Sequence, residues 1–135
     1  MRLLIADTQA VVRHGLKQVL LESGEVDAVD ELQEGRQVVR HLRESAYDAL
    51  ILDAALTRSC GKELLTEIGM VAPGIPVLLL SYTGEDHCDV RLREAGVLGN
   101  LTKAQAPQHV VPAVRALIGG GSYFELPADC EHQSA

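Results

Sequence analysis

Residues 48–61 read DALILDAALTRSCG, and the order of residue types in this stretch decides the fold. Four apolar residues, 49–52, run directly into one carboxylate, Asp53, which a polar loop is expected to follow. A continuous apolar run without alternation is typical of a strand buried on both faces, as in the interior of a parallel sheet. The stretch therefore predicts a core strand that ends on an acid.

The rest of the chain repeats this pattern. Apolar runs predict further core strands at 3–6, 77–80 and 97–101, with a weaker edge strand at 26–29. Apolar residues at helical spacing predict helices around 12–20, 38–42, 64–71, 85–95 and 110–118. Strand and helix thus alternate along the chain, and helical crossovers favour parallel strands with right-handed connections. We expect an α/β fold with an open, doubly wound parallel sheet of five strands.

Composition narrows the function classes. A chain of 135 residues is expected to form one domain with a sizeable core. Its 12 basic and 19 acidic residues give a net charge of −7, which argues against binding of nucleic acid by this chain itself. The apolar runs are too short to cross a membrane. Three cysteines without CxxC spacing indicate reduced thiols, and we expect a cytoplasmic protein.

Polar residues stand where the predicted core strands end. Asp7 follows the first strand, Asp53 and Ser81 end later ones, and Lys103 follows the last. Any one of them alone is best explained as the start of a solvated loop. In an open parallel sheet, however, the carboxyl ends of the strands meet where ligands bind. Two carboxylates there repel each other unless a lysine or a hard divalent cation lies beside them.

Enzymatic alternatives have weaker support. No glycine-rich loop follows the first strand, which argues against a nucleotide-binding Rossmann or P-loop site. Ser81 lies in LLLSYTG, without the leading glycine of a hydrolase nucleophile elbow. An unrelated small α/β enzyme remains a distant alternative, because the sequence reveals no substrate pocket.

At this point the pattern resembles the receiver domain of a bacterial response regulator of the LuxR/NarL type. The resemblance covers roughly residues 1–124. It rests on LLIADTQAVVRHGL near the start, on LILDAAL followed by Gly61, and on a strand that ends in Ser81. It also rests on AGVLGNLTKAQAP and on AVRALIGGGSYF near the close. No single motif is decisive, but five in this order and spacing are specific.

The resemblance implies a flavodoxin-like sheet in the strand order 2-1-3-4-5 and a role for each polar residue. Asp53 would accept a phosphoryl group from a sensor histidine kinase, so the chain would be a phosphoacceptor and not an enzyme. Asp7, Asp53 and the backbone carbonyl of Ala55 would hold Mg²⁺. Lys103 would pair with Asp53 and then with a phosphoryl oxygen. Ser81 would bind another phosphoryl oxygen and pull its loop inward.

Three positions depart from the family pattern. The second acid after the first strand, usually a direct metal ligand, is Thr8, which should weaken Mg²⁺ binding. The proline usual after the phosphoacceptor is Thr57. The aromatic switch residue of the fifth strand is Asn100. Two interpretations follow: a working phosphoacceptor, slightly favoured because Asp53, Ser81 and Lys103 are retained, or a degenerate pseudo-receiver that serves as a phosphorylation-independent dimerisation or interaction module.

The resemblance also bears on organisation and partners. We expect a receiver domain at 1–118 and a linker or tail at 119–135, rich in glycine at its start. DNA binding would belong to a helix-turn-helix domain in a longer parent protein that controls transcription. We expect no membrane contact. One helical face is a candidate surface for homodimerisation.

Two local predictions concern helices. Pro112 lies inside the last helical pattern, where a proline costs about 3 kcal/mol. We therefore expect that helix to begin late, near His109, so that Pro112 falls in its first turn. The helix at 85–95 has a thin apolar stripe and should be the most mobile regular element.

Overall fold

A parallel sheet lies at the centre of the computed structural model, which describes residues 1–59, 63–82 and 96–124. Within these residues the strand order is β2-β1-β3-β4-β5-β6. The strands are β1 (Arg2–Ala6), β2 (Ala28–Leu32), β3 (Ala49–Asp53), β4 (Val77–Ser81), β5 (Val97–Thr102) and β6 (Tyr123–Phe124). All neighbouring strands pair in parallel, so the carboxyl ends of the core strands share one edge.

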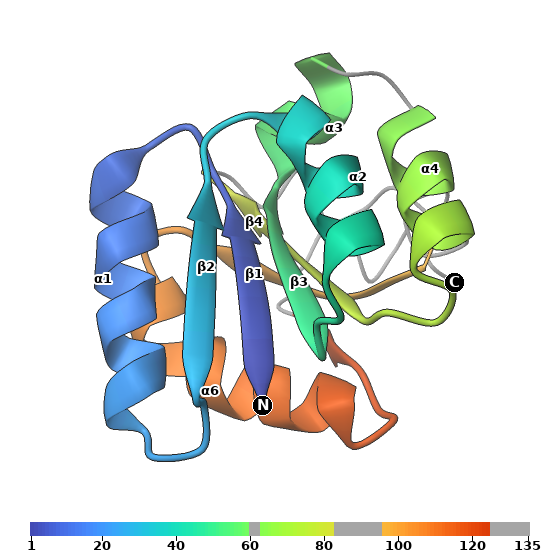
Figure 1. Cartoon of the computed structure of the whole chain (residues 1–135). Coiled ribbons are helices and arrows are strands. Elements are labelled where there is room, and N and C mark those ends of the chain that lie inside the picture. The colour runs from blue at the N-terminus through green and yellow to red at the C-terminus, as the bar shows by residue number, and fades with distance from the viewer. Residues whose placement is uncertain (60–62, 83–95, 125–135) are drawn as a thin grey trace, which may run out of the picture.

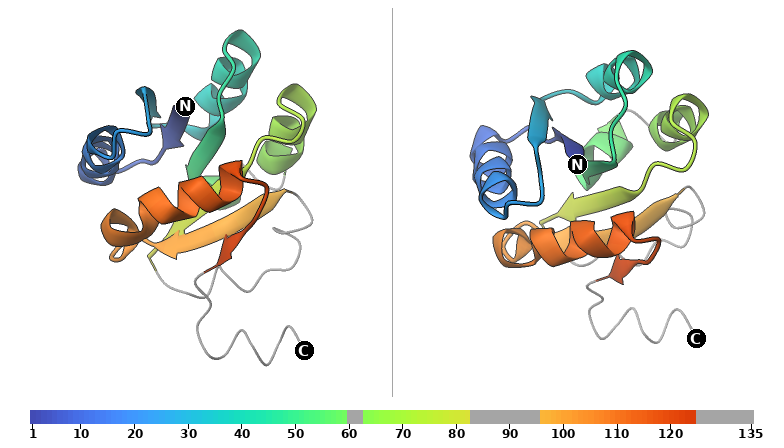
Figure 2. Two further views of the ribbon diagram at one scale, coloured as in Figure 1. Left: turned by 90° about the horizontal axis from the view of Figure 1, so that it is seen from below. Right: turned by 60° about the horizontal axis from the view of Figure 1, so that its bottom comes forward.

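Helices cover both faces of this sheet (Figures 1 and 2). One face carries α1 (Ala10–Glu22) and α6 (Ala106–Ile118). The other face carries α2 (Gly35–Glu44), α3 (Ala54–Ser59) and α4 (Glu63–Val71). This three-layer arrangement is the open, doubly wound α/β architecture that the alternating pattern predicts.

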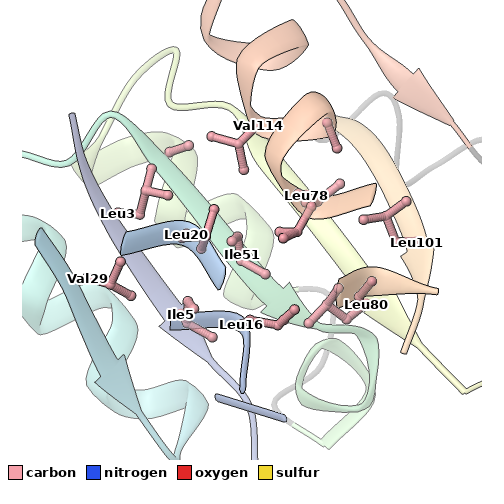
Figure 3. Packing of buried hydrophobic residues seen from close by; sticks show 14 of the residues in the cluster. Leu3, Ile5, Leu16, Leu20, Val29, Ile51, Leu78, Leu80, Leu101 and Val114 are labelled. Carbon is pink, nitrogen blue, oxygen red and sulfur yellow. The ribbon is translucent and has the colours of Figure 1, made fainter. Parts of the chain in front are cut away.

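Side-chain alternation along the core strands explains the two apolar layers. Leu3 and Ile5 of β1 pack in the cluster with α1 and α6, part of which Figure 3 shows. Leu4 and Ala6, on the opposite face of the same strand, pack in the cluster with α2, α3 and α4. Each fully buried leucine contributes roughly 1.5–3 kcal/mol. Every residue of β3 and β4 is buried, which is why their sequences are apolar without alternation.

The strand order 2-1-3-4-5 is confirmed, and the four predicted core strands lie where the apolar runs are. The edge strand differs from the prediction, because β2 spans Ala28–Leu32 and not 26–29. Edge strands commonly carry charged side chains, and the acidic pair Asp30-Glu31 lies within the strand, with Asp30 paired to Arg2 and Glu31 to Arg13. The expected polar loop after Asp53 is also wrong, because the chain enters α3 at once.

The predicted late start of the last helix is wrong as well. Helix α6 begins at Ala106, with Pro107 in its first turn and Pro112 inside it. Proline suits a helix start, where its missing N–H would have no helical partner. Deep burial of Ala106, Val110, Ala113 and Val114 favours a helix that continues through Pro112. Tertiary packing therefore outweighs the local cost of this proline.

The range predicted as a linker, 119–135, contains strand β6. Tyr123 and Phe124 pair with Gly99 and Asn100 of β5. The side chain of Tyr123 also reaches back to α6, with its hydroxyl 3.0 Å from Nδ1 of His109. Residues 125–135 and the predicted helix at 85–95 lie outside the described residues. In the described part of the chain, no helix is long and apolar enough to span a membrane.

Candidate functional site

Polar side chains collect at the carboxyl edge of the sheet, as the strand-end pattern predicts. Asp7 follows β1, and Asp53 and Ser81 end β3 and β4. All three are buried, with 0%, 3% and 2% of their surface exposed. Such burial is unusual for carboxylates, which are rarely fully buried without a charged partner.

That partner is Lys103, which follows β5. Its ammonium nitrogen lies 3.1 Å from Oδ1 of Asp7 and 3.1 Å from Oδ2 of Asp53. Its side chain is only 6% exposed. The sequence-predicted trio of Asp7, Asp53 and Lys103 therefore meets in one buried cluster, which we call the acid pocket.

The turn after β1 holds Asp7 in place. The backbone N–H of Gln9 donates to Oδ1 of Asp7 at 2.8 Å. Arg13 of α1 donates from Nη1 to the carbonyl oxygen of Asp7 at 2.6 Å. The guanidinium of Arg13 is itself paired with Glu31 of β2 at 3.3 Å. Hydrogen bonds from both the turn and helix α1 thus hold Asp7 in position.

Asp53 is oriented by the helix that follows it. The backbone N–H of Ala55 donates to Oδ1 of Asp53 at 3.0 Å, while Oδ2 faces Lys103. The positive end of a helix dipole favours a carboxylate at this position. Because the chain turns directly from β3 into α3, Ala55 contacts Asp53 through its amide.

Ser81 and Asn100 occupy different positions relative to the acid pocket. The backbone N–H of Lys103 donates to the carbonyl oxygen of Ser81 at 2.8 Å, which joins the end of β4 to the pocket. Asn100 is buried within β5, where it pairs with Leu79 on one side and Phe124 on the other. Asn100 therefore lies inside the sheet, between β4 and β6, and the sequence did not predict β6.

Burial raises the pKa of Asp7 above its ordinary value of 3.8. The hydrogen bonds from Gln9 and Lys103 act in the opposite direction, and the neighbouring charge of Asp53 adds to the rise. Desolvation is the largest of these effects, because it disfavours the charged form of a carboxyl in a low-dielectric site. Burial therefore makes the charged form of Asp7 less favourable in the folded protein than in the unfolded chain.

The oxygen donors of the pocket fit a hard divalent cation. Asp7 Oδ2 is buried and accepts no hydrogen bond from the described residues, although it lies 3.0 Å from the lysine ammonium as an ion pair. Mg²⁺ is commonly bound by one or two carboxylates together with water molecules. No cluster of three or more His, Cys, Asp or Glu side chains that could hold a metal occurs within the described ranges. Asp7 and Asp53 are therefore the two carboxylates that the acid pocket offers to such an ion.

Thr8 lies outside this cluster. Its side chain is exposed, and it lines an open groove of about 620 Å³ between α2 and α4. Leu56, Leu64 and Glu67 also line this groove. Thr8 therefore lies beside this groove, whose lining includes none of Asp7, Asp53 and Lys103.

Sequence reasoning missed two contacts of Lys103. Its ammonium donates to Oε1 of Gln9 at 2.9 Å, and it lies 4.7 Å from the ring centre of Tyr82. Both residues are close in sequence to predicted site residues, Gln9 two positions after Asp7 and Tyr82 next to Ser81. A search of the positions just beyond each strand end could have found them.

Comparison with known proteins places this geometry in context. The family model for the response regulator receiver domain matches residues 3–115. Response regulator UvrY of Escherichia coli K12 is 27% identical over 132 residues, which cover 98% of this chain and 60% of the relative. Response regulator VraR of Staphylococcus aureus Mu3 is 28% identical over 92% of this chain and 59% of its own length. The chain thus spans about 60% of the length of these curated relatives.

Solved structures show the same fold. The isolated REC domain of RcsB from Salmonella enterica serovar Typhimurium has a TM-score of 0.83 at 22% identity, covering 99% of this chain and 98% of that one. A LuxR-family two-component response regulator from Aurantimonas sp. SI85-9A1 has a TM-score of 0.81 at 22% identity, covering 97% and 92%. At this level of identity the likeness shows the fold alone.

Proposed function

The chain belongs to the response regulator receiver domain family, and from this premise we propose that Asp53 accepts a phosphoryl group from a sensor histidine kinase. The observation that carries the proposal is the position of Lys103, whose ammonium bridges the buried carboxylates of Asp7 and Asp53. Phosphoryl transfer depends on positioning and on cations beside the transferred group. The acid pocket supplies both.

In the proposed reaction, a carboxylate oxygen of Asp53 attacks the phosphorus atom of the donor. An O–P bond forms to Asp53, and the P–N bond to the donor histidine breaks, with the imidazole taking up a proton. The ammonium of Lys103, already 3.1 Å from Asp53, is placed to pair with a phosphoryl oxygen as charge develops there. We assign Ser81 to a second phosphoryl oxygen, because it ends the neighbouring strand at the same edge.

Receiver domains generally bind Mg²⁺ at the phosphorylation site. Here Asp7 and Asp53 would hold the ion, together with the backbone carbonyl of Ala55, and the ion would neutralise charge on the phosphoryl oxygens. Thr8 supplies no carboxylate. We therefore propose that Mg²⁺ binding is weaker here than in relatives with two acids after β1.

Intact-mass measurement tests the proposal. The protein is incubated with Mg²⁺ and acetyl phosphate, and in a second arm with phosphoramidate. We expect a mass increase of one phosphoryl group in the wild type and in the surface control Asp27→Asn, whose side chain is 87% exposed. We expect no increase in Asp53→Asn. A persistent adduct in Asp53→Asn would place the phosphoryl group elsewhere.

The pseudo-receiver is the second candidate function, and the replacement at Thr8 together with the buried Asn100 favours it. In this alternative the sheet and helices form a binding or dimerisation module that needs no phosphorylation. Absence of any adduct in both donor arms, with a native circular dichroism spectrum, would support it over the phosphoacceptor.

We propose that the transcriptional output belongs to a longer parent protein that contains this receiver domain. One solved relative is described as an RcsB–DNA complex, and the chain covers 66% of that structure. We propose that a helix-turn-helix domain beyond the receiver gives transcriptional control in a cytoplasmic protein of this kind. The net charge of −7 is unsuited to binding DNA, and because β6 belongs to the sheet, the residues beyond it would act as the linker.

A further inference from the structure

We infer that Gln9 is a positioning residue for Lys103 and so sets the readiness of the acid pocket for phosphoryl transfer. This inference rests on the proposed function. The side-chain oxygen of Gln9 lies 2.9 Å from the lysine ammonium, the shortest of the three hydrogen bonds that Lys103 donates from its side chain to described residues. No assigned role in the pocket accounts for this contact.

Among the described residues, the ammonium of Lys103 has three oxygen acceptors. An ammonium has three hydrogens to donate, and they go to Asp7, Asp53 and Gln9 at 3.1, 3.1 and 2.9 Å. Gln9 is the only one of the three that is neutral. It fixes the direction of the lysine without adding a negative charge to a pocket that must receive an anion.

The amide of Gln9 has one defined orientation. Its oxygen and nitrogen are distinguished by the hydrogen bonds that they make. Because the ammonium only donates, the atom that faces Lys103 must be the oxygen Oε1. The contact is therefore a true acceptor interaction, made by a half-buried side chain.

A purely structural role for Gln9 does not explain this geometry. Gln9 is the N-cap residue of α1, but its side chain makes no capping hydrogen bond to that helix. Shorter polar side chains such as Asn, Ser and Asp are the usual N-caps. Here the longer side chain reaches across to Lys103, 94 positions away in the sequence. The side chain of Gln9 therefore accepts a hydrogen bond from Lys103 in the acid pocket and does not cap helix α1.

The consequence for the reaction follows from charge. When Asp53 is phosphorylated, the carboxylate oxygen that faced Lys103 loses its charge, and that hydrogen bond is free to move to a phosphoryl oxygen. Gln9 and Asp7 keep the ammonium in place while this exchange happens. Without Gln9, only Asp7 would still accept a hydrogen bond from Lys103 during this exchange. The ammonium of this flexible side chain would then no longer be held in position for the reaction.

Three substitutions separate this role from stability. Gln9→Met keeps the length of the side chain but removes the acceptor. Gln9→Asn cannot reach Lys103 but is a better N-cap, so its Tm should equal or exceed that of the wild type. Gln9→Glu keeps an acceptor oxygen. Gln18→Met, on the exposed side of the same helix, is the matched control.

The first measurement is independent of phosphorylation. The chain has three lysines, Lys17, Lys62 and Lys103, so a ¹⁵N-detected spectrum of side-chain ammonium groups is simple to assign with Lys103→Arg. A firmly hydrogen-bonded ammonium exchanges its hydrogens slowly and gives a sharp signal. We expect that signal from Lys103 in the wild type, Gln9→Glu and Gln18→Met, and its loss by broadening in Gln9→Met and Gln9→Asn.

The second measurement is the rate of adduct formation with acetyl phosphate. We expect about a tenfold lower rate in Gln9→Met and Gln9→Asn, which is less than the roughly 10²–10³-fold cost of removing a charge-stabilising donor itself. Gln18→Met should react like the wild type. A slower rate in the more stable Gln9→Asn variant would not be a folding defect.

The outcomes distinguish the two proposals. The role of Gln9 is overturned if the Lys103 signal is unchanged in Gln9→Met, or if Gln9→Met and Gln9→Asn both form the adduct at the wild-type rate. Either result leaves Asp53 as the acceptor. If the wild type forms no adduct, the proposed function fails, and the ammonium spectrum still decides whether Gln9 positions Lys103.

Discussion

At the scale of single residues, the buried carboxylate of Asp7 in the acid pocket lowers the stability of the folded protein. Asp7 is completely buried, and its burial raises its pKa. The folded state therefore holds its proton more tightly than the unfolded chain. Between the ordinary pKa of 3.8 and the raised one, the free energy of unfolding therefore falls as pH rises. The charge needed at the site weakens the fold that carries it.

Asp7→Asn should consequently stabilise the protein at neutral pH. The amide keeps an oxygen for the N–H of Gln9 and removes the buried charge, so we expect a gain of about 0.5–2 kcal/mol, the usual size of a stabilising substitution. Urea unfolding at several pH values checks this. The gain should shrink as pH falls through the raised pKa toward the ordinary value of 3.8, and it should level off below that value. Asp27→Asn should change stability by less than about 0.5 kcal/mol, and an equal gain in that control would contradict the explanation.

The charged members of the site were predictable from sequence, whereas the contact of Gln9 was not. Asp7, Asp53 and Lys103 each stand at a strand end, and the topology of a parallel sheet brings such positions together. Gln9 reaches the pocket only because its side chain turns away from α1. A glutamine at an N-cap carries no sequence signal for that choice, because both directions suit its chemistry. The depth at which Asn100 is buried depends on β6, which the sequence indicated only as a linker.

At the scale of secondary structure, α6 shows how packing overrides local preference. The proline-based prediction of a late start was wrong because α6 buries one side of its first two turns against the sheet. Strand positions were predictable, since unbroken apolar runs have few alternatives in a parallel sheet. Helix α3 was not, because six residues are too few for a periodic pattern.

Pro112→Ala should stabilise α6. Alanine restores a backbone N–H that can donate to the carbonyl of Gln108 and removes the clash of the ring with the preceding turn. We expect the free energy of unfolding to rise by about 1–3 kcal/mol. The matched control is Pro107→Ala in the first turn, where proline is well tolerated and the change should be small. Equal effects in chemical denaturation would show that the interior position carries no special cost.

At the scale of the whole molecule, Gly99 allows the last strand to close onto the sheet. A Cβ at this position would lie 2.7 Å from the carbonyl oxygen of Tyr123 and 3.0 and 3.1 Å from methyl groups of Leu78 and Leu117. The backbone contact cannot yield by a side-chain rotation. Only glycine therefore permits β6 to lie this close to β5 and α6.

Gly99→Ala should displace β6 and destabilise the protein by about 1–3 kcal/mol, as expected for overpacking. Gly15→Ala in α1 is the control, because a Cβ there meets nothing within 4 Å and should stabilise the helix by about 0.5–1 kcal/mol. Thermal unfolding of both variants, with amide exchange at residues 123–124, checks the prediction. Unchanged exchange and stability in Gly99→Ala would mean that β6 does not pair with β5 in solution.

The edge strand β2 has a consequence for many copies of the chain held at high concentration. It is an end strand of the sheet in the described part of the chain, and the outer backbone groups of an edge strand can pair with another strand, which is the usual route to aggregation. Asp30 and Glu31 stand side by side in the middle of this strand. Asp30 is paired with Arg2 of β1 and Glu31 with Arg13 of α1, so a second strand that approached this edge would meet a row of charged side chains. Because charged side chains on an edge strand disfavour pairing with a further strand, we expect this edge to resist edge-to-edge association.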